Sequence, residues 1–225
     1  MTRVVFFVTG TDTGVGKTVL GALLARSLGD RGVLSAALKP VCSGGRADAR
    51  ALQVASNGAL TLDEINPWRF RAPVAPSLAA CQDNRKVRLS EVLAHLRAMR
   101  KRFDVLVVEG AGGLLSPLGD QFDSRNLITA LGAVPIVVCP NRLGAINQVR
   151  LTLEALSRRA KAKARIVLMS PERPDSATGT NGDLLAGFFD ARRLFTLPWL
   201  GRRFDIHTVL KQPSLRRTLR ELTWV

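Results

Sequence analysis

Cysteine and histidine are scarce in this sequence, which holds three cysteines and two histidines in 225 residues. The cysteines, at positions 42, 81 and 139, show neither paired nor metal-ligand spacing. The two histidines, His95 and His207, do not form a metal-ligand motif with them. The pattern argues against a disulfide scaffold and a zinc site, and it fits a reduced compartment.

Long hydrophobic runs are also missing. No stretch approaches the ~18 apolar residues that a membrane span requires. The apolar residues 4–8 run straight into a glycine-rich turn and lack the small-residue cleavage site of a secretory signal. We therefore expect a cytoplasmic protein without a membrane partner.

Acidic residues are few: 18 Asp and Glu stand against 33 Lys and Arg, which gives a net charge of +15. The densest basic runs, 97–102 and 158–165, are expected to close helices, where cations complement the helix dipole. No basic strand interleaved with aromatics accompanies the charge, so we predict no nucleic-acid partner. A basic surface does favour acidic substrates such as nucleotides.

Apolar segments alternate with amphipathic ones along most of the chain. Expected strands cover residues 3–9, 33–38, 104–109, 134–139, 165–169 and 194–197. Helices are expected over residues 18–30, 48–56, 126–131 and 145–159, and a further helix is expected to begin with Ser90 as its cap. Residues 66–76 contain three prolines and are expected to form a structured loop. This alternation predicts a mainly parallel sheet with helices on both faces.

A phosphate-binding loop follows the first expected strand. Residues 10–18 read GTDTGVGKT, so a strand leads into Gly10, Gly16-Lys17-Thr18 and then a helix, the context that a P-loop requires. The first glycine lies one residue earlier than in the standard motif. Backbone N–H groups of such a loop wrap phosphates, Lys17 adds a positive charge, and the Thr18 hydroxyl can bind Mg²⁺. Together with the alternation, the loop predicts an α/β P-loop NTPase-like three-layer sandwich, with residues 1–225 as one domain and 201–225 its least defined part.

Two carboxylates are candidates for a magnesium site, which needs hard oxygen ligands. Glu109 ends an apolar strand before glycines, so it should lie beside the phosphate loop at the carboxyl edge of the sheet. Asp48 follows the second strand by a short loop, where helix capping is an equally good explanation.

Lys39, Ser43 and Cys42 follow the second strand. Lys39 could face the phosphates or be a surface lysine, and Ser43 with Gly44 could merely form a turn. Nothing close in sequence would activate the Cys42 thiolate, so we interpret it as a packing residue.

These pieces together resemble the dethiobiotin synthetase family. The resemblance rests on residues 7–18, on Lys39-Pro40-Val41 with Ser43-Gly44, and on residues 108–113 (VEGAGG). Further similarities occur at residues 66–70, 143–147 and 197–200, in the family's order. One difference is Met169-Ser170 at the end of a strand, where the family often has an asparagine that reads adenine.

The resemblance implies a homodimeric enzyme of single P-loop domains that makes dethiobiotin, ADP and phosphate from 7,8-diaminononanoate, CO2 and ATP. It implies that one substrate amine forms a carbamate, that the carbamate attacks the γ-phosphate to give a carbamic–phosphoric anhydride, and that the second amine closes the ring. Mg²⁺ is the implied cofactor.

The resemblance also implies roles for individual residues. Lys17 and Lys39 would be catalytic, and Thr18, Asp48 and Glu109 would bind Mg²⁺. Thr13, Lys39 and Ser43 would hold the diamine and its carbamate, while Gly144, Ile146 and Asn147 of a partner subunit would hold its carboxylate. The expected ATP-binding residues are Asp12, Thr13, Gly14, Val15, Gly16, Lys17, Thr18, Glu109 and Gly112.

Two other functions fit part of the pattern. An amide-forming synthetase acting on a cobalamin precursor would need an attached glutamine-hydrolysing domain, for which we expect no room in 225 residues. A partition-type P-loop ATPase, a nucleotide-gated interaction protein, would typically carry a second lysine early in the loop, where this sequence has Asp12.

Overall fold

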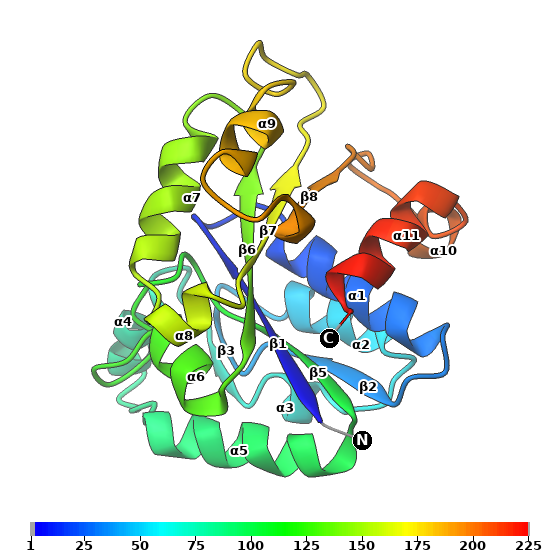
Figure 1. Cartoon of the computed structure of the whole chain (residues 1–225). Helices are drawn as coiled ribbons and strands as arrows, with labels where there is room; N and C mark the ends of the chain where they lie inside the picture. Colours follow the sequence, from blue (N-terminus) through cyan, green and yellow to red (C-terminus); the bar gives the residue numbers. More distant parts are fainter. Residues whose placement is uncertain (1–2, 225) are drawn as a thin grey trace.

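A six-stranded, fully parallel sheet forms the centre of the molecule in the computed structural model, which describes residues 3–224 (Figure 1). The strand order is β2-β5-β1-β6-β7-β8. The strands are β1 (Val4–Gly10), β2 (Ser35–Leu38), β5 (Val105–Glu109), β6 (Val134–Pro140), β7 (Arg165–Met169) and β8 (Leu194–Leu197). All six expected strands are confirmed, because each is a short apolar run that the sheet buries.

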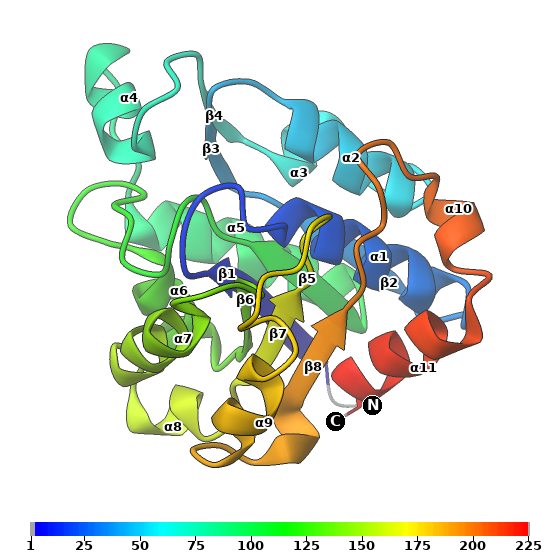
Figure 2. The same ribbon diagram turned by 90° about the horizontal axis from the view of Figure 1, so that it is seen from above.

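Helices cover both faces of this sheet (Figures 1 and 2). On one face, α1 (Lys17–Gly29) packs against α2 (Ala47–Ala55) and α11 (Pro213–Leu222). On the other face lie α5 (Leu89–Arg102), α6 (Ser124–Leu131) and α7 (Ala145–Glu154). The three-layer α/β sandwich predicted from the sequence is therefore confirmed.

Shorter helices and a small second sheet lie at the carboxyl edge and at the ends of the main sheet. A second, two-stranded parallel sheet joins β3 (Val41–Ser43) to β4 (Trp68–Phe70). The short helices are α3 (Leu62–Ile65), α4 (Pro76–Gln82), α8 (Arg158–Lys161), α9 (Asn181–Ala186), the 3-10 turn η1 (Ala191–Arg193) and α10 (Ile206–Val209).

Three local predictions were wrong. Residues 66–76 are not only a loop, because β4 lies within them and Pro76 opens α4 from the first turn, where proline is tolerated. The expected helix 145–159 ends at Glu154; the Ser157 hydroxyl then accepts the Ala160 N–H at 3.3 Å and starts α8. The basic run 158–165 therefore does not close that helix.

The third correction concerns Ser90, which lies in the first turn of α5 and does not cap it. Arg88 is the cap residue, with extended backbone, and the Glu91 carboxylate accepts its N–H at 3.4 Å. The other basic run behaves as expected, because Arg100, Lys101 and Arg102 form the last turn of α5.

The last residues dock through α10 and α11. Leu215, Leu219 and Leu222 lie one or two turns apart on α11 and are buried, so they face α1 and β8. Val225 lies outside the described residues. Among residues 3–224, no helix combines the length and low polarity that crossing a bilayer requires.

Candidate functional site

A cavity of about 740 Å³ opens at the carboxyl edge of the sheet, where β1, β2 and β5 end. Strands in a parallel sheet present their carboxyl ends together, so residues that follow separate strands meet there. Ten of the residues predicted from the sequence line it: Thr13, Gly14, Gly16, Lys17, Thr18, Lys39, Ser43, Asp48, Glu109 and Gly112. Asp12 and Val15 belong to the same loop but do not line this cavity.

The loop between β1 and α1 has the backbone of a phosphate-binding site. Gly16 caps α1 at φ 100°, a conformation that side chains disfavour, and so turns the chain into the helix. A Cβ on Gly10 would lie 2.6 Å from the Val15 Cγ2 atom, so the displaced first glycine is required by close packing within the loop.

Lys17 is fixed within this loop. Its ammonium donates to the Asp12 carbonyl oxygen at 2.7 Å, and the Asp12 carboxylate in turn accepts the Thr13 N–H at 2.6 Å. Burial lowers the pKa of Lys17 to about 8, although Glu109 partly opposes this effect. A bound anion would raise this pKa again, because it stabilises the charged ammonium.

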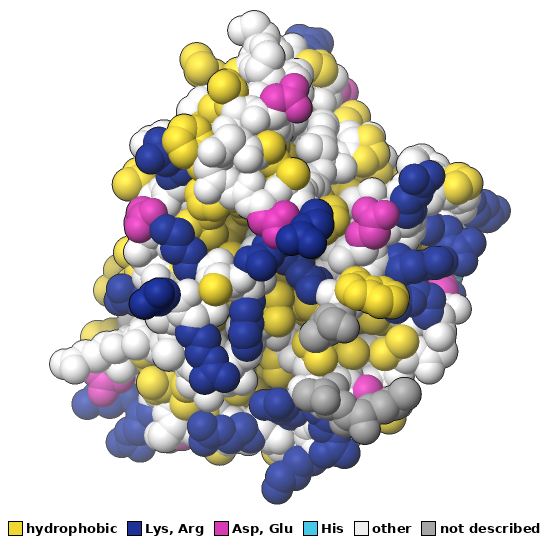
Figure 3. Space-filling model, in the orientation of Figure 1, with side chains coloured by type: hydrophobic (Ala, Val, Ile, Leu, Met, Phe, Trp, Pro, Cys, Tyr) yellow, Lys and Arg dark blue, Asp and Glu magenta, His cyan; other side chains and the backbone are white. Residues whose placement is uncertain are grey.

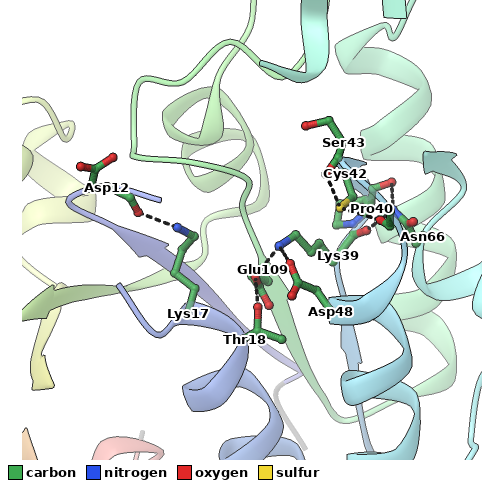
Figure 4. A network of polar contacts seen from close by, with 11 residues as sticks. Asp12, Lys17, Thr18, Lys39, Pro40, Cys42, Ser43, Asp48, Asn66 and Glu109 are labelled. Atoms are coloured by element: carbon green, nitrogen blue, oxygen red, sulfur yellow. Dashed lines mark hydrogen bonds and ion pairs between the residues drawn. The ribbon is translucent and has the colours of Figure 1, made fainter. Parts of the chain in front are cut away.

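Lys39 lies between two carboxylates on the other side of the cavity (Figure 4). Its ammonium donates to the Glu109 Oε1 atom at 2.7 Å and also forms an ion pair with Asp48. The Thr18 hydroxyl donates to the same Glu109 oxygen at 2.8 Å. The three residues predicted to bind Mg²⁺ thus converge around Lys39, although they come from α1, α2 and β5.

The electrostatics of this cluster follow from its burial. Burial raises the pKa of Glu109, which is 1% exposed, while Lys39 and Thr18 oppose that rise. Burial also works against the charge of Lys39, but Glu109 and Asp48 outweigh it and raise its pKa above the ordinary value. Lys39 therefore stays protonated as the counter-charge of both carboxylates.

Asp48 does not act as a helix cap. It lies in the first turn of α2, after the cap residue Arg46, and its side chain is turned to Lys39. Among residues 3–224, no three His, Cys, Asp or Glu side chains are grouped as a metal site. The cluster of Thr18, Asp48 and Glu109 offers two carboxylates and one hydroxyl, and the Glu109 Oε2 atom is buried without a hydrogen-bond partner within residues 3–224.

The remaining predicted residues near Lys39 line the same cavity. The Ser43 hydroxyl donates to the Val74 carbonyl at 2.6 Å. Cys42 is buried, and burial raises the pKa of its thiol, which agrees with a packing role. Gly112 lies across from Thr13, whose Oγ1 would be 3.7 Å from a Cβ on that glycine.

Sequence reasoning assigned no role to Asn66, which the structure places behind Lys39. Asn66 is fully buried, and its amide donates to the Lys39 carbonyl at 2.8 Å, so it fixes the turn that presents the lysine. The only sequence signal at Asn66 is the family similarity of residues 66–70. Ser116 was also missed; it lines the cavity and its hydroxyl accepts the Gly113 N–H at 2.9 Å.

Gly144, Ile146 and Asn147 do not line this cavity. They lie at the start of α7, which Gly144 caps at φ 90°. The neighbouring Leu143 N–H donates to Asp175 at 2.7 Å, and the Ala145 N–H donates to Arg142. Within the described chain, the N–H groups of Gly144, Ile146 and Asn147 are not engaged.

A loop of this geometry at a helix N-terminus, with a buried lysine and a carboxylate at the end of the adjacent strand, defines a P-loop nucleotide-binding protein. A family model described as an AAA domain matches residues 5–202. The ATP-dependent dethiobiotin synthetase BioD of Anaeromyxobacter dehalogenans (strain 2CP-C) is 42% identical over 86% of this chain and 89% of its own. The corresponding protein of Bacillus subtilis (strain 168) is 34% identical over 93% and 91%. The chain therefore belongs to the dethiobiotin synthetase family of ATP-dependent ligases.

Solved structures support the fold alone. A pNOB8 ParA protein bound to nonspecific DNA superposes with a TM-score of 0.59 at 13% identity, covering 98% of this chain and 97% of that one. A ParA family ATPase of Chlorobium tepidum TLS gives 0.58 at 14% identity, covering 97% and 96%. At 13–14% sequence identity, the structural similarity gives no information about binding partners.

Proposed function

We propose that the chain, acting as a single P-loop domain, converts 7,8-diaminononanoate, CO2 and ATP to dethiobiotin, ADP and phosphate. The observation that carries this proposal is the convergence of Lys17, Lys39 and Glu109, all buried, on one cavity beside the phosphate loop. A generic ATPase does not need a second buried lysine opposite its P-loop. An enzyme that must hold a carbamate against a triphosphate does.

The reaction has three steps. One amine of the substrate adds to CO2 and loses a proton, which gives a carbamate. A carbamate oxygen then attacks the γ-phosphorus, the bond to ADP breaks, and a carbamic–phosphoric anhydride forms. The second amine attacks the anhydride carbonyl and loses a proton, phosphate leaves with its bonding electrons, and the cyclic urea closes.

The protein's contribution to these steps is positioning and charge neutralisation, as is general for phosphoryl transfer. The backbone N–H groups of residues 12–18 hold the phosphates, with Glu109 and Gly112 at the facing loop. Lys17 bridges the phosphates and the carbamate. Lys39, Thr13 and Ser43 hold the diamine, its carbamate and the phosphoryl group in transfer.

Mg²⁺ fits the cluster of Thr18, Asp48 and Glu109, because these are hard oxygen ligands and Glu109 has a buried oxygen without a partner. Such an ion usually takes one or two carboxylates, with water and phosphate oxygens completing its shell. When bound, it neutralises charge on the β- and γ-phosphates. Lys39 would then be free to turn from the carboxylates toward the carbamate.

We further propose a homodimer in which Gly144, Ile146 and Asn147 of each subunit hold the substrate carboxylate in the partner's site. Their unengaged N–H groups at a helix N-terminus suit an anion. Because the reaction consumes ATP, we expect it to occur in the cytoplasm.

The test is phosphate release from Mg-ATP and bicarbonate with and without 7,8-diaminononanoate, with mass spectrometry for the cyclic urea. Phosphate release that depends on the diamine, with dethiobiotin as product, supports the proposal. Phosphate release that is independent of the diamine, with no cyclic urea formed, contradicts it.

Lys17→Ala, Lys39→Ala and Glu109→Ala should each abolish turnover while the circular dichroism spectrum stays native. Near-normal turnover in one of them would remove that residue from the mechanism.

A further inference from the structure

Lys39 and Asp48 lie at the two ends of a segment that leaves β2 and enters α2. The pairing of β2 with β5 in the main sheet ends at Leu38, before this segment begins. Within it, Gly44 and Gly45 have φ values of 79° and 114°, a backbone conformation that other residues disfavour. The position of the Lys39 ammonium against Asp48 therefore depends on contacts from outside the segment.

The stretch between α3 and β4 holds the backbone at Lys39 and Pro40. The Lys39 N–H donates to the Ile65 carbonyl at 3.0 Å. The Trp68 N–H donates to the Pro40 carbonyl at 3.1 Å. Between these two bonds, the Asn66 amide donates to the Lys39 carbonyl at 2.8 Å and to the Pro40 carbonyl at 3.5 Å (Figure 4). One stretch of chain thus fixes the turn from which the Lys39 side chain starts.

Asn66 is also bonded to the other end of the segment. Its main-chain carbonyl accepts a hydrogen bond from the Arg46 guanidinium at 3.2 Å, and Arg46 forms an ion pair with Asp63 of α3. Arg46 is the cap residue of α2, whose first turn carries Asp48. Asn66 is itself held in place, because it ends α3 and its N–H donates to the Leu62 carbonyl at 2.9 Å. A single residue therefore ties the two ends of the segment together.

The side-chain N–H of Asn66 is the group that an apolar residue of similar size would lack. Asn66 is fully buried, and its Oδ1 atom has no hydrogen-bond partner within residues 3–224. An unpaired buried oxygen costs free energy, so packing alone does not explain an asparagine at this position. The contact of its amide with the Lys39 carbonyl does explain it.

We propose that Asn66 and Arg46 are positioning residues of the reaction, which set the place of the Lys39 ammonium without lining the cavity themselves. This ammonium lies 2.7 Å from the Glu109 Oε1 atom, so a small shift of the Lys39 backbone takes it out of hydrogen-bond range. A misplacement of about 1 Å can lower a rate about 100-fold. The inference rests on the proposed function, since it concerns turnover in that reaction.

Steady-state kinetics of dethiobiotin formation test the role of Asn66. Asn66→Ala should lower kcat about 10- to 100-fold, because Lys39 loses its fixed place. The KM for ATP should stay unchanged, since the backbone of the phosphate loop is not altered. Wild-type kcat in a folded Asn66→Ala variant, or a raised KM for ATP without a loss of kcat, would overturn the inference.

Leu219→Ala is the control for lowered stability, because it removes a buried side chain of α11 that does not line the cavity. Both variants are assayed at a temperature where circular dichroism shows them folded. Leu219→Ala should keep the wild-type kcat. If it loses as much kcat as Asn66→Ala, the loss follows from stability alone and the inference is wrong.

Variants of Arg46 decide the question if Asn66→Ala does not fold. Arg46→Met removes the donor to the Asn66 carbonyl and should lower kcat about tenfold, whereas Arg46→Lys keeps a charged donor and should recover most of that loss. Asp63→Asn is the matched control; it removes only the exposed ion-pair partner and should leave kcat unchanged.

The outcomes for Arg46 separate the inference from the proposed function. Wild-type kcat in Arg46→Met, or an equal loss in Arg46→Lys or Asp63→Asn, would contradict positioning through the Asn66 carbonyl. The absence of dethiobiotin with the wild-type protein would mean that the proposed function itself has failed.

Discussion

Lys39 decides the charge balance of the site at the scale of a single residue. It neutralises a fully buried carboxylate, Glu109, and a half-exposed one, Asp48. Removing one partner of a buried ion pair leaves an uncompensated charge, which typically costs several kcal/mol. The same lysine lies between the two carboxylates, so a cation that binds both of them takes over its role as counter-charge.

Lys39→Met should therefore lower the thermal unfolding midpoint by roughly 5–10 °C in the absence of metal. Added Mg²⁺ should restore much of that loss, because the freed carboxylates can bind it. The measurement is differential scanning calorimetry with and without Mg²⁺. Lys86→Met, at an exposed position, serves as the control. A variant that melts like the wild type without metal would show that Lys39 is not the required counter-charge.

The free energy of unfolding should depend on pH through His95, because the surroundings of this side chain shift its pKa. Burial lowers its pKa, despite the Glu64 carbonyl 2.8 Å from its Nε2 atom, and the ring of Trp68 packs edge-on against it. Since the unfolded chain binds this proton more readily, acid favours the unfolded state through His95. The free energy of unfolding should fall as the pH drops below about 6.5.

Urea denaturation at pH 7.5 and pH 5.5 measures this effect. His95→Gln should lose less stability than the wild type over that interval, because it has no proton to take up. His207→Gln, on the exposed side of α10, should keep the wild-type difference. Equal pH slopes for His95→Gln and wild type would assign the acid sensitivity to other groups.

Local patterns were sufficient for the residues that lie next to a motif in sequence. Lys17 and Glu109 could be predicted because a strand end and a glycine turn fix their positions. Asn66 could not, because its importance lies in a contact with the Lys39 carbonyl, which is distant in sequence. The same is true of Val74, whose carbonyl holds Ser43.

Among the helices and strands, those with an unbroken run of apolar residues could be predicted from the sequence. β1, β5 and β6 are unbroken buried runs, so their type and place followed from the sequence. β3 and β4 are three residues each and exist only because they pair with one another. The break between α7 and α8 depends on a single capping serine inside a segment that otherwise continues a helical pattern.

The docking of α11 on α1 is a testable property of one element. Leu219 is fully buried in this contact, and the Arg31 guanidinium donates to the Thr223 hydroxyl at 3.0 Å beside it. Leu219→Ala should lower the free energy of unfolding by about 2–5 kcal/mol, because it leaves a cavity between two packed helices.

Arg217→Ala, on the exposed side of the same helix, should change stability by less than about 0.5 kcal/mol. Urea denaturation followed by circular dichroism compares the two variants. Similar, small effects for both would mean that α11 contributes little to the stability of the core.

Basic side chains are not confined to the cavity, since only Lys17 and Lys39 of the 33 Lys and Arg line it. Figure 3 shows Lys and Arg scattered across one face, with apolar and neutral side chains between them. Some are paired with nearby acids, such as Lys161 with Glu154 and Arg202 with Glu172. Such a field draws a triphosphate toward the protein without specifying where it binds, so specificity rests on the cavity.

The site of one chain is incomplete if Gly144, Ile146 and Asn147 act on a partner's substrate, and mixed dimers can reveal this. Lys17→Ala removes the phosphate half of a site, and Asn147→Asp places a negative charge against the substrate carboxylate. Each variant alone should be inactive. When the two are unfolded and refolded together in equal amounts, heterodimers carry one site with both native halves. About a quarter of the wild-type rate should then return, because half of the dimers are mixed and each has one intact site of two. No recovery, with mixed dimers demonstrated by native mass spectrometry, would mean that each chain binds the substrate carboxylate itself.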